Sequence, residues 1–159
     1  MKYQDLAKKL KDIAEEDQKI RKRVVKGWAK KDIQAMMEFD KKSTLELKAI
    51  VTKIGWPTIS KVGKGSSKAA WLIVQHSSDV KFQERCLKLM EQCLDDIDPQ
   101  NYAYLKDRLL VEAGKPQIYG TQSKLDKKTG ETQLYQIEDP DKVNTFRKEV
   151  GLEPLNGTK

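Results

Sequence analysis

Three ionisable side chains interrupt helical faces that are otherwise apolar. Asp17 and Asp40 each stand where a repeat of three- and four-residue steps calls for an apolar residue, and His76, the only histidine, ends the apolar run 69–74. Burying an unpaired charge is unfavourable, so such groups are expected to have partners. An imidazole titrates near neutral pH, and a carboxylate behind it fixes its tautomer. The predicted catalytic set is therefore His76 as general acid/base, assisted by Asp17 or Asp40.

A second group of polar residues is expected to bind the substrate. An arginine can hold a carboxylate or phosphate through two parallel hydrogen bonds, while glutamine and threonine side chains orient polar groups. We expect this group to line one pocket between the helices and a hairpin, which predicts a hydrolase or group transferase for a small anionic, amide-bearing or peptide ligand. The predicted binding set is Arg108, Asp107, Gln75, Gln117, Tyr119, Thr121, Gln122, Trp56 and Ser60.

Several alternatives stay open. The polar set could be a structural network in which His76 is a satisfied core residue, Asp107 and Arg108 form a salt bridge, and the two other aspartates pair with the backbone or with Arg21. Asp17, Asp40 and His76 could also form a metal site of two carboxylates and one imidazole. The spacing does not require a metal, so the favoured prediction is that these residues bind no metal. The sequence contains no complete cofactor motif, and the cofactor stays unknown.

Two further alternatives involve no chemistry. The chain could be a binding module for a ligand or a protein partner. It could also bind nucleic acid through the basic face of its first helix, because the net charge is +7. Acidic residues are mixed into that face and no aromatic residues interleave it, which favours an ordinary solvated surface.

Composition sets the broad class. The 159 residues are 38% hydrophobic and 35% charged, and they predict one basic domain over 1–159 that is monomeric. No run of about 18 apolar residues is present, so no membrane span is expected. The first residues lack the apolar core of a secretory signal, and we expect a cytoplasmic protein.

The elements that must position these residues are mostly helices. The fold class is predicted to be mainly α: a compact helical bundle of about six helices in all, with one appended β-hairpin. The bundle is expected over 3–114, the hairpin over about 117–137, and a C-terminal helix over 140–150 with a tail. Ser66 or Ser67 is expected to cap the helix that carries His76, and Met37 and Leu94 are expected to face inward. The expected helices in the bundle run over 3–25, 32–54, 66–76, 80–95 and 99–113, and the expected strands over 117–122 and 132–137, around a turn at 126–131.

Taken together, the motifs resemble a family of small bacterial single-domain proteins known only as a domain of unknown function. The resemblance covers nearly the whole chain and implies a bacterial protein, but it implies no activity, substrate or cofactor. It adds that the family's pattern contains polar residues that packing alone does not require. The motifs are Gly55-Trp56-Pro57, Ala69-Ala70-Trp71-Leu72-Ile73-Val74-Gln75-His76, Tyr102-Ala103-Tyr104-Leu105-x-Asp107-Arg108, Gly114-x-Pro116-Gln117-x-Tyr119-Gly120-Thr121-Gln122 and Gly151-Leu152-x-Pro154-Leu155.

Overall fold

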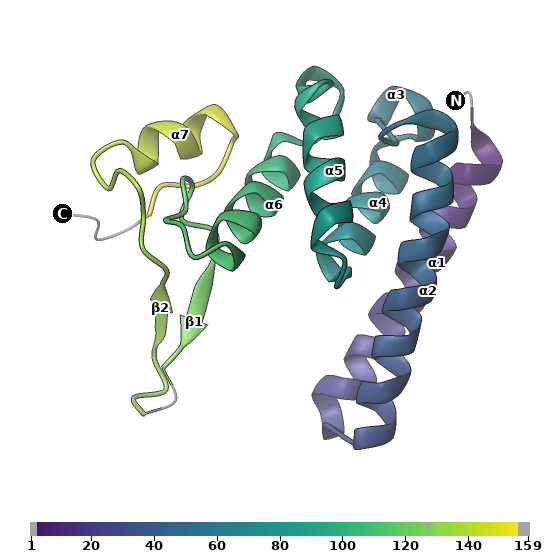
Figure 1. Cartoon of the computed structure of the whole chain (residues 1–159), viewed down its shortest axis with the longest axis horizontal. Coiled ribbons are helices and arrows are strands. Elements are labelled where there is room, and N and C mark those ends of the chain that lie inside the picture. The colour runs from purple at the N-terminus through teal and green to yellow at the C-terminus, as the bar shows by residue number, and fades with distance from the viewer. Residues whose placement is uncertain (1–2, 127, 156–159) are drawn as a thin grey trace. The chain divides into compact units, whose positions relative to one another are not determined.

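The computed structural model describes residues 3–126 and 128–155, and these are mainly helical with one two-stranded antiparallel hairpin (Figure 1). The predicted fold class is thereby confirmed. The chain divides into two compact units, of which the first ends at Ile97 and the second begins at Asp98. The expectation of one domain over 1–159 stays a prediction.

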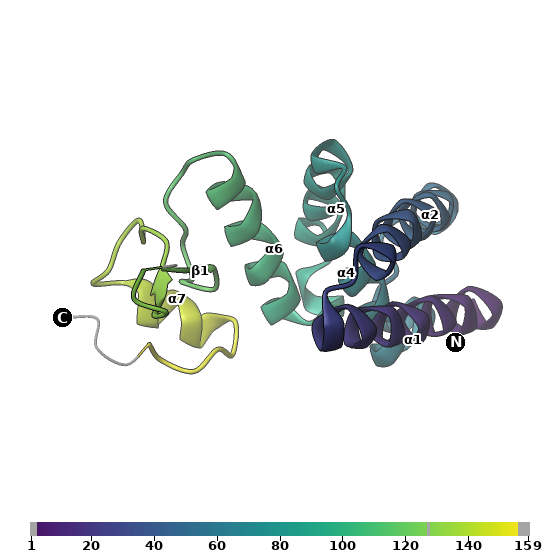
Figure 2. The same ribbon diagram turned by 90° about the horizontal axis from the view of Figure 1, so that it is seen from below.

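The first unit is built on two long helices that lie side by side, with a third helix packed against both (Figures 1 and 2). Apolar residues on these three helices are fully buried, among them Leu10, Leu47 and Val74. Burying a leucine or valine side chain contributes about 1.5–3 kcal/mol, so the apolar stripes hold the three helices together. The elements are α1 (Gln4–Gly27), α2 (Lys30–Ile54), α3 (Ile59–Val62), α4 (Lys64–His76), α5 (Val80–Glu91) and a 3-10 turn, Leu94–Asp96.

The start of α4 differs from the expectation. Gly63, not a serine, is its N-cap, and the helix already begins at Lys64. Ser66 and Ser67 lie inside the helix and are buried. The Ser66 hydroxyl donates to the carbonyl oxygen of Ala7 at 2.8 Å, so this side chain ties α4 to α1 instead of capping a helix end.

The end of α4, where His76 lies, is held by α5. Asp79 caps α5 as an acceptor from the Phe82 backbone N–H at 3.0 Å. Gln83, on the first turn of α5, is 1% exposed and donates to the carbonyl oxygens of Val74 (3.0 Å) and Ser77 (3.1 Å). These bonds satisfy carbonyl groups that the helix end leaves free, and they fix the residues on either side of His76.

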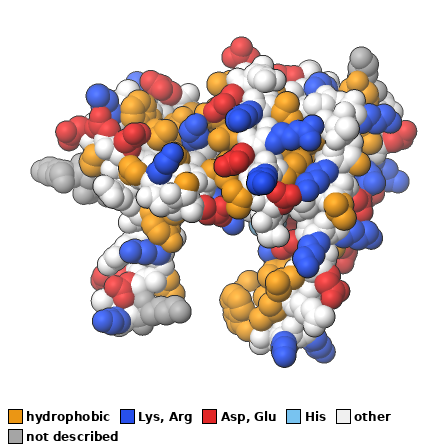
Figure 3. Space-filling view, in the orientation of Figure 1, with side chains coloured by type: hydrophobic (Ala, Val, Ile, Leu, Met, Phe, Trp, Pro, Cys, Tyr) orange, Lys and Arg blue, Asp and Glu red, His pale blue; other side chains and the backbone are white. Residues whose placement is uncertain are grey.

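The far end of the α1–α2 pair carries exposed apolar side chains. Trp28 closes α1 in a left-handed conformation (φ 48°) and is 68% exposed, beside the connection to α2. Val25 and Met37 are exposed as well, and Figure 3 shows hydrophobic surface at this end. The inward position predicted for Met37 is therefore wrong, and so is that of Leu94, which is 43% exposed. Met37 lies in the N-terminal third of α2, and Leu94 begins the 3-10 turn instead of continuing α5.

The second unit comprises α6 (Pro99–Glu112), β1 (Ser123–Leu125), β2 (Thr132–Leu134) and α7 (Val143–Glu149). Asp98 caps α6 as an acceptor from the Gln100 backbone N–H at 3.0 Å, and Pro99 is at its first position, as expected. The strands pair with Ser123 opposite Leu134. Gly130 has a φ of +74°, which fits the predicted turn, although Lys127 of that turn lies outside the described residues.

The first predicted strand is wrong in position. Residues 117–122 form a loop, and pairing begins only at Ser123. This loop touches the second arm of the hairpin through an isolated bridge between Gln117 and Ile137. Most of its backbone N–H groups donate instead to side chains, above all to that of Asp107. The C-terminal helix is also shorter than predicted, beginning at Val143.

Among the described residues, no helix combines the length and the apolar character that crossing a membrane requires.

Candidate functional site

Arg21 is the centre of a polar cluster to which three helices contribute. Its Nε lies 2.8 Å from Oδ1 of Asp17, one turn earlier on α1, and its Nη2 lies 2.6 Å from Oδ1 of Asp40 on α2. One guanidinium group therefore bridges both carboxylates that interrupt the apolar stripes. Its Nη1 also lies 3.1 Å from the Met36 sulfur. The three predicted catalytic residues, which are far apart in sequence, meet around this side chain.

His76 joins the cluster from the last turn of α4. Its Nδ1 lies 3.1 Å from Oδ1 of Asp17 and 3.0 Å from Nε of Arg21. When Nδ1 carries the proton, it can donate a hydrogen bond to the Asp17 oxygen. When Nδ1 carries no proton, it can accept a hydrogen bond from the Arg21 N–H. The heavy atoms therefore accommodate both neutral tautomers. Nε2 has no hydrogen-bond partner among residues 3–126 and 128–155, and the side chain is 24% exposed. One ring nitrogen therefore contacts the cluster, while the other is accessible to solvent.

Asp17 is the most buried member of the cluster, with 4% exposure. Burial, the largest single influence on its carboxyl, raises the pKa, but the hydrogen bond and charge of His76 and the charge of Arg21 outweigh it and hold the pKa below the ordinary value. Its second oxygen accepts from Nε2 of Gln18 at 2.8 Å. Asp17 is therefore a fixed carboxylate whose two oxygens both have donors.

The pKa of Asp40 is shifted in the opposite direction, above its ordinary value. Burial raises the pKa of its carboxyl, and the charge and hydrogen bond of Arg21 only partly offset this effect. Its backbone carbonyl accepts from the Thr44 hydroxyl at 2.7 Å, which fixes this part of α2. Two carboxyl groups a few ångströms apart thus have pKa values shifted away from each other, an arrangement that enzymes use to keep one carboxyl ionised while another carries a proton.

The three predicted catalytic residues also have the geometry of a cation site. One ligand atom from each of Asp17, Asp40 and His76 lies within 4.8 Å of the others. Two carboxylate oxygens and an imidazole nitrogen suit several divalent transition metals. The Arg21 guanidinium already holds both carboxylates, so a metal ion at this place would compete with it.

Six residues of the predicted binding set lie in the second unit, and two of them, Asp107 and Gln117, have 0% exposure. One of the Asp107 oxygens accepts from the backbone N–H groups of Ile118 (2.8 Å) and Tyr119 (3.1 Å). The other accepts from Tyr119 (3.1 Å), from the Thr121 N–H (3.0 Å) and from the Thr121 hydroxyl (2.9 Å). The carboxylate is saturated by the loop 117–122 and gives that loop its shape.

Gln117, at the start of this loop, is also enclosed by hydrogen bonds to the backbone. Its side chain is fully buried, donates to the carbonyl oxygens of Gln122 and Tyr135 (both 2.9 Å) and accepts from the Gln122 N–H at 2.8 Å. The side chain of Gln122 donates to the Thr121 hydroxyl at 3.1 Å. A ligand could reach the amide of Gln117 only by displacing the loop.

The remaining residues of the predicted binding set make contacts with other partners. Arg108 pairs with Glu112, one turn along α6, at 3.1 Å. In the first unit, the Ser60 N–H donates to Asp96 at 2.9 Å, Gln75 is buried, and the indole N–H of the buried Trp56 has no partner among the described residues. Substrate binding by these residues and by Tyr119, and the pocket expected between the helices and the hairpin, stay predictions.

Sequence reasoning named Arg21 only as a partner of aspartates in the structural alternative. The available signal was its place four residues after Asp17, on the same face of a helix. Nothing local indicated that it would also reach Asp40 on the next helix.

Comparison with known proteins gave one match. No curated protein and no solved structure matches the chain. A model of a family of unknown function, DUF6624, matches residues 4–158 and so spans nearly the whole chain, through both units. This agrees with the family resemblance of the sequence motifs, and it assigns no activity. The chain belongs to this family of unknown function, DUF6624.

Proposed function

We propose that the chain is an enzyme in which His76 transfers protons during a hydrolysis or group-transfer reaction. The observation that carries the proposal is the arrangement of the imidazole ring: Nδ1 lies 3.1 Å from Oδ1 of the buried Asp17 carboxylate, and Nε2 is accessible to solvent and has no hydrogen-bond partner among the described residues. A carboxylate behind the ring orients it and stabilises the imidazolium that forms when the outer nitrogen takes a proton.

In the proposed reaction, Nε2 of His76 removes a proton from a water or hydroxyl nucleophile. The oxygen of that nucleophile forms a bond to the electrophilic centre of the substrate, and the bond to the leaving group breaks. The imidazolium then returns its proton to the leaving group. Asp17 is a positioning residue, because it acts through the ring. Asp40 is held by Arg21 at 2.6 Å and is the second carboxyl group of the cluster.

The test is turnover of p-nitrophenyl esters by the parent protein: a phosphate monoester, a phosphate diester and a carboxylate ester. We expect release of p-nitrophenol with at least one, and a loss of about 10²–10⁴-fold in rate for His76→Gln. Adding imidazole to His76→Ala should restore part of the rate, which a purely structural role for His76 would not allow. Equal rates in the parent and His76→Gln would contradict the proposal.

A non-catalytic binding module is distinguished by the same proteins. Such a module would give no turnover that depends on His76. An enzyme of the proposed kind should lose rate in His76→Gln while it keeps most of its affinity for the ester it acts on.

The second candidate is a metal site at the same three residues, favoured by the 4.8 Å grouping of their ligand atoms. Titration calorimetry with Zn²⁺ and Mn²⁺ tests it. A site should bind with one-to-one stoichiometry, lose affinity in Asp40→Asn, and gain affinity in Arg21→Gln because the competing cation is gone. Weaker metal binding by Arg21→Gln than by the parent would argue against a metal site. So would the absence of any metal binding by the parent.

A further inference from the structure

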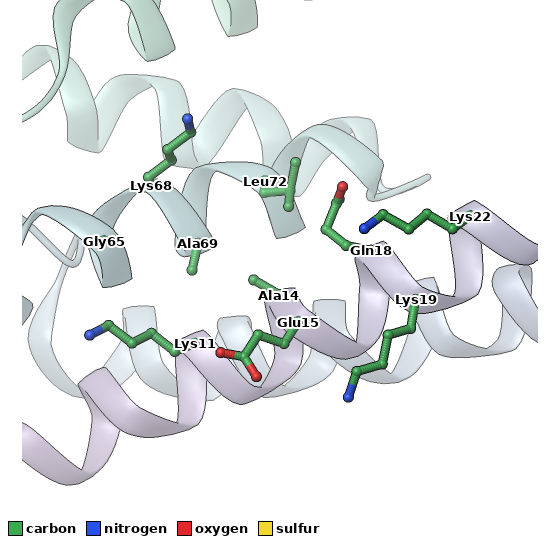
Figure 4. A pocket seen from close by; sticks show the side chains of 10 residues that line it. All are labelled: Lys11, Ala14, Glu15, Gln18, Lys19, Lys22, Gly65, Lys68, Ala69 and Leu72. Atoms are coloured by element: carbon green, nitrogen blue, oxygen red, sulfur yellow. The ribbon is translucent and has the colours of Figure 1, made fainter.

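A groove of about 580 Å³ runs between α1 and α4 in the first unit (Figure 4). This volume lies in the range of small-molecule sites. Four lysines surround the groove: Lys11, Lys19 and Lys22 from α1 and Lys68 from α4. In Figure 4, Lys11 lies near one end, and Lys22 and Gln18 lie together near the other.

The charge of the groove is not neutralised by its own walls. Four lysines face one acidic lining residue, Glu15, so the lining has four positive charges against one negative. Lys19 lies 3.7 Å from Glu16. The other three lysines have no ion pair with any carboxylate in the described part of the chain. Unpaired cations around a concave surface concentrate anions there.

The groove also has an apolar part of its lining. Ala14, Ala69 and Leu72 contribute it, and two of these three side chains are a single methyl group. At the end near Lys11, Gly65 contributes no side chain, and a Cβ placed there would lie 3.4 Å from Cε of Lys11. The groove therefore suits a ligand with a flat apolar body and several negative charges.

The groove adjoins the candidate catalytic cluster. Gln18 lines it and also donates to Oδ2 of Asp17 at 2.8 Å. Leu72 lines it and lies one helical turn before His76 on α4. A ligand in the groove therefore lies beside Gln18, which contacts the carboxylate that holds the imidazole ring.

We propose that this groove binds a phosphorylated small molecule of about nucleotide size, which is the substrate class of the enzyme proposed above. That the ligand is a substrate rests on the proposed function, whereas its binding can be tested independently. Lysine ammonium groups bind phosphate as point charges. A single carboxylate would leave most of the three unpaired lysines without a partner, whereas a phosphate or pyrophosphate group carries enough charge for them.

Calorimetric titration of the whole protein with ADP, pyrophosphate and adenosine tests the inference. The decisive variant replaces Lys11, Lys22 and Lys68 together by Gln. Its matched control replaces Lys31, Lys53 and Lys88, three exposed lysines of the same unit outside the groove, and so removes the same charge. We expect saturable ADP binding that weakens about tenfold or more in the groove variant and less than about twofold in the control, with adenosine weaker than ADP.

Three results would overturn the inference. One is no saturable binding of ADP or pyrophosphate by the parent up to about 1 mM. Another is equal weakening in both triple variants, which would indicate charge without a site. The third is a single-stranded oligonucleotide that binds about 100-fold tighter than ADP with affinity that grows with length, which would indicate an extended nucleic-acid surface.

His76→Gln separates this inference from the proposed function. If the variant keeps its ADP affinity but loses turnover, both hold. If ADP binding depends on the groove lysines but turnover does not depend on His76, the groove is a binding site and the catalytic proposal fails. If carboxylate-ester turnover depends on His76 and phosphorylated compounds do not bind, the substrate class is wrong and the catalytic proposal stands.

Discussion

The two units each contain a buried aspartate with several hydrogen bonds, but the partners differ. Asp107 accepts from backbone N–H groups and one hydroxyl within its own unit, and it is completely enclosed. Asp17 accepts from side chains of Arg21, His76 and Gln18, and its network ends at a partly exposed imidazole. Bonds to backbone fix the path of the chain, whereas bonds to ionisable side chains fix charge and proton position. The comparison separates a structural carboxylate from one suited to chemistry.

The largest expected effect is from Asp107→Asn. An amide presents an NH₂ group to N–H donors that now bind a carboxylate, so several buried donors lose their acceptor. We expect the free energy of unfolding to fall by roughly 3–5 kcal/mol, measured by urea denaturation. Hydrogen exchange at the amides of Ile118, Tyr119 and Thr121 should accelerate with it.

The matched control for that variant is Asp141→Asn, which removes the same charge from an exposed residue of the same unit. It should change stability by less than about 0.5 kcal/mol. If the two variants are equally stable, Asp107 does not hold the loop 117–122, and the contrast between the two aspartates is lost.

Asp17→Asn should have an intermediate effect. The variant removes the charge that faces Arg21 and His76, but Arg21 keeps Asp40, so we expect a loss of about 2 kcal/mol at pH 7. The pKa of Asp17 is lowered in the folded protein, so its stabilisation is complete above the unfolded value of about 3.9 and is lost as the pH falls through the folded value. Denaturation at pH 7 and at pH 3 should show the difference between parent and variant shrinking, while Asp12→Asn on the same helix shows little at either pH.

His76→Gln should affect stability least among substitutions in the cluster. Glutamine keeps a polar group near Asp17, and residues retained for function commonly contribute little to stability. We expect the free energy of unfolding to stay within about 0.5 kcal/mol of the parent. A loss of more than about 2 kcal/mol would make His76 a structural residue like Asp107 and would remove the distinction between the two sites.

Asp40 offers a test of sign. Its pKa is raised in the folded protein, so its contribution to stability is complete below the unfolded value of about 3.9 and is lost as the pH rises through the folded value. Melting temperatures between pH 3 and pH 6 should therefore show the parent losing stability relative to Asp40→Asn as the pH rises. The opposite slope would mean that Arg21, rather than burial, dominates at Asp40.

The sequence predicted the two long helices of the first unit, α1 and α2, closely because their apolar spacing is regular. The same spacing identified Asp17 and Asp40 as interruptions, and the structure brings both to His76. Asp17, Ile20 and Val24 are buried as the stripe on α1 required. Local pattern was sufficient there because each helix buries one continuous face.

The loop 117–122 shows where local pattern fails. Its residue types, with Ile118, Tyr119 and Thr121 close together, are typical of a strand. In the structure, however, Asp107 accepts from its N–H groups. The residues of the loop give no indication that an acceptor on the preceding helix, α6, competes for its N–H groups. The role of Arg21 was hidden for the same reason, since the spacing within α1 shows its pairing with Asp17 but not its reach to Asp40 on α2.

His76 is the only histidine of the chain, and its Nδ1 faces an acceptor and a donor at almost the same distance. The two tautomers place the bonded proton on different ring nitrogens, and a protonated and a bare ring nitrogen have very different ¹⁵N chemical shifts. A spectrum of protein labelled only at histidine would therefore contain the ring signals of this one residue, with nothing to assign. The position of the proton inside the cluster can thus be read directly, and its response to an added ligand can be followed at a single resonance.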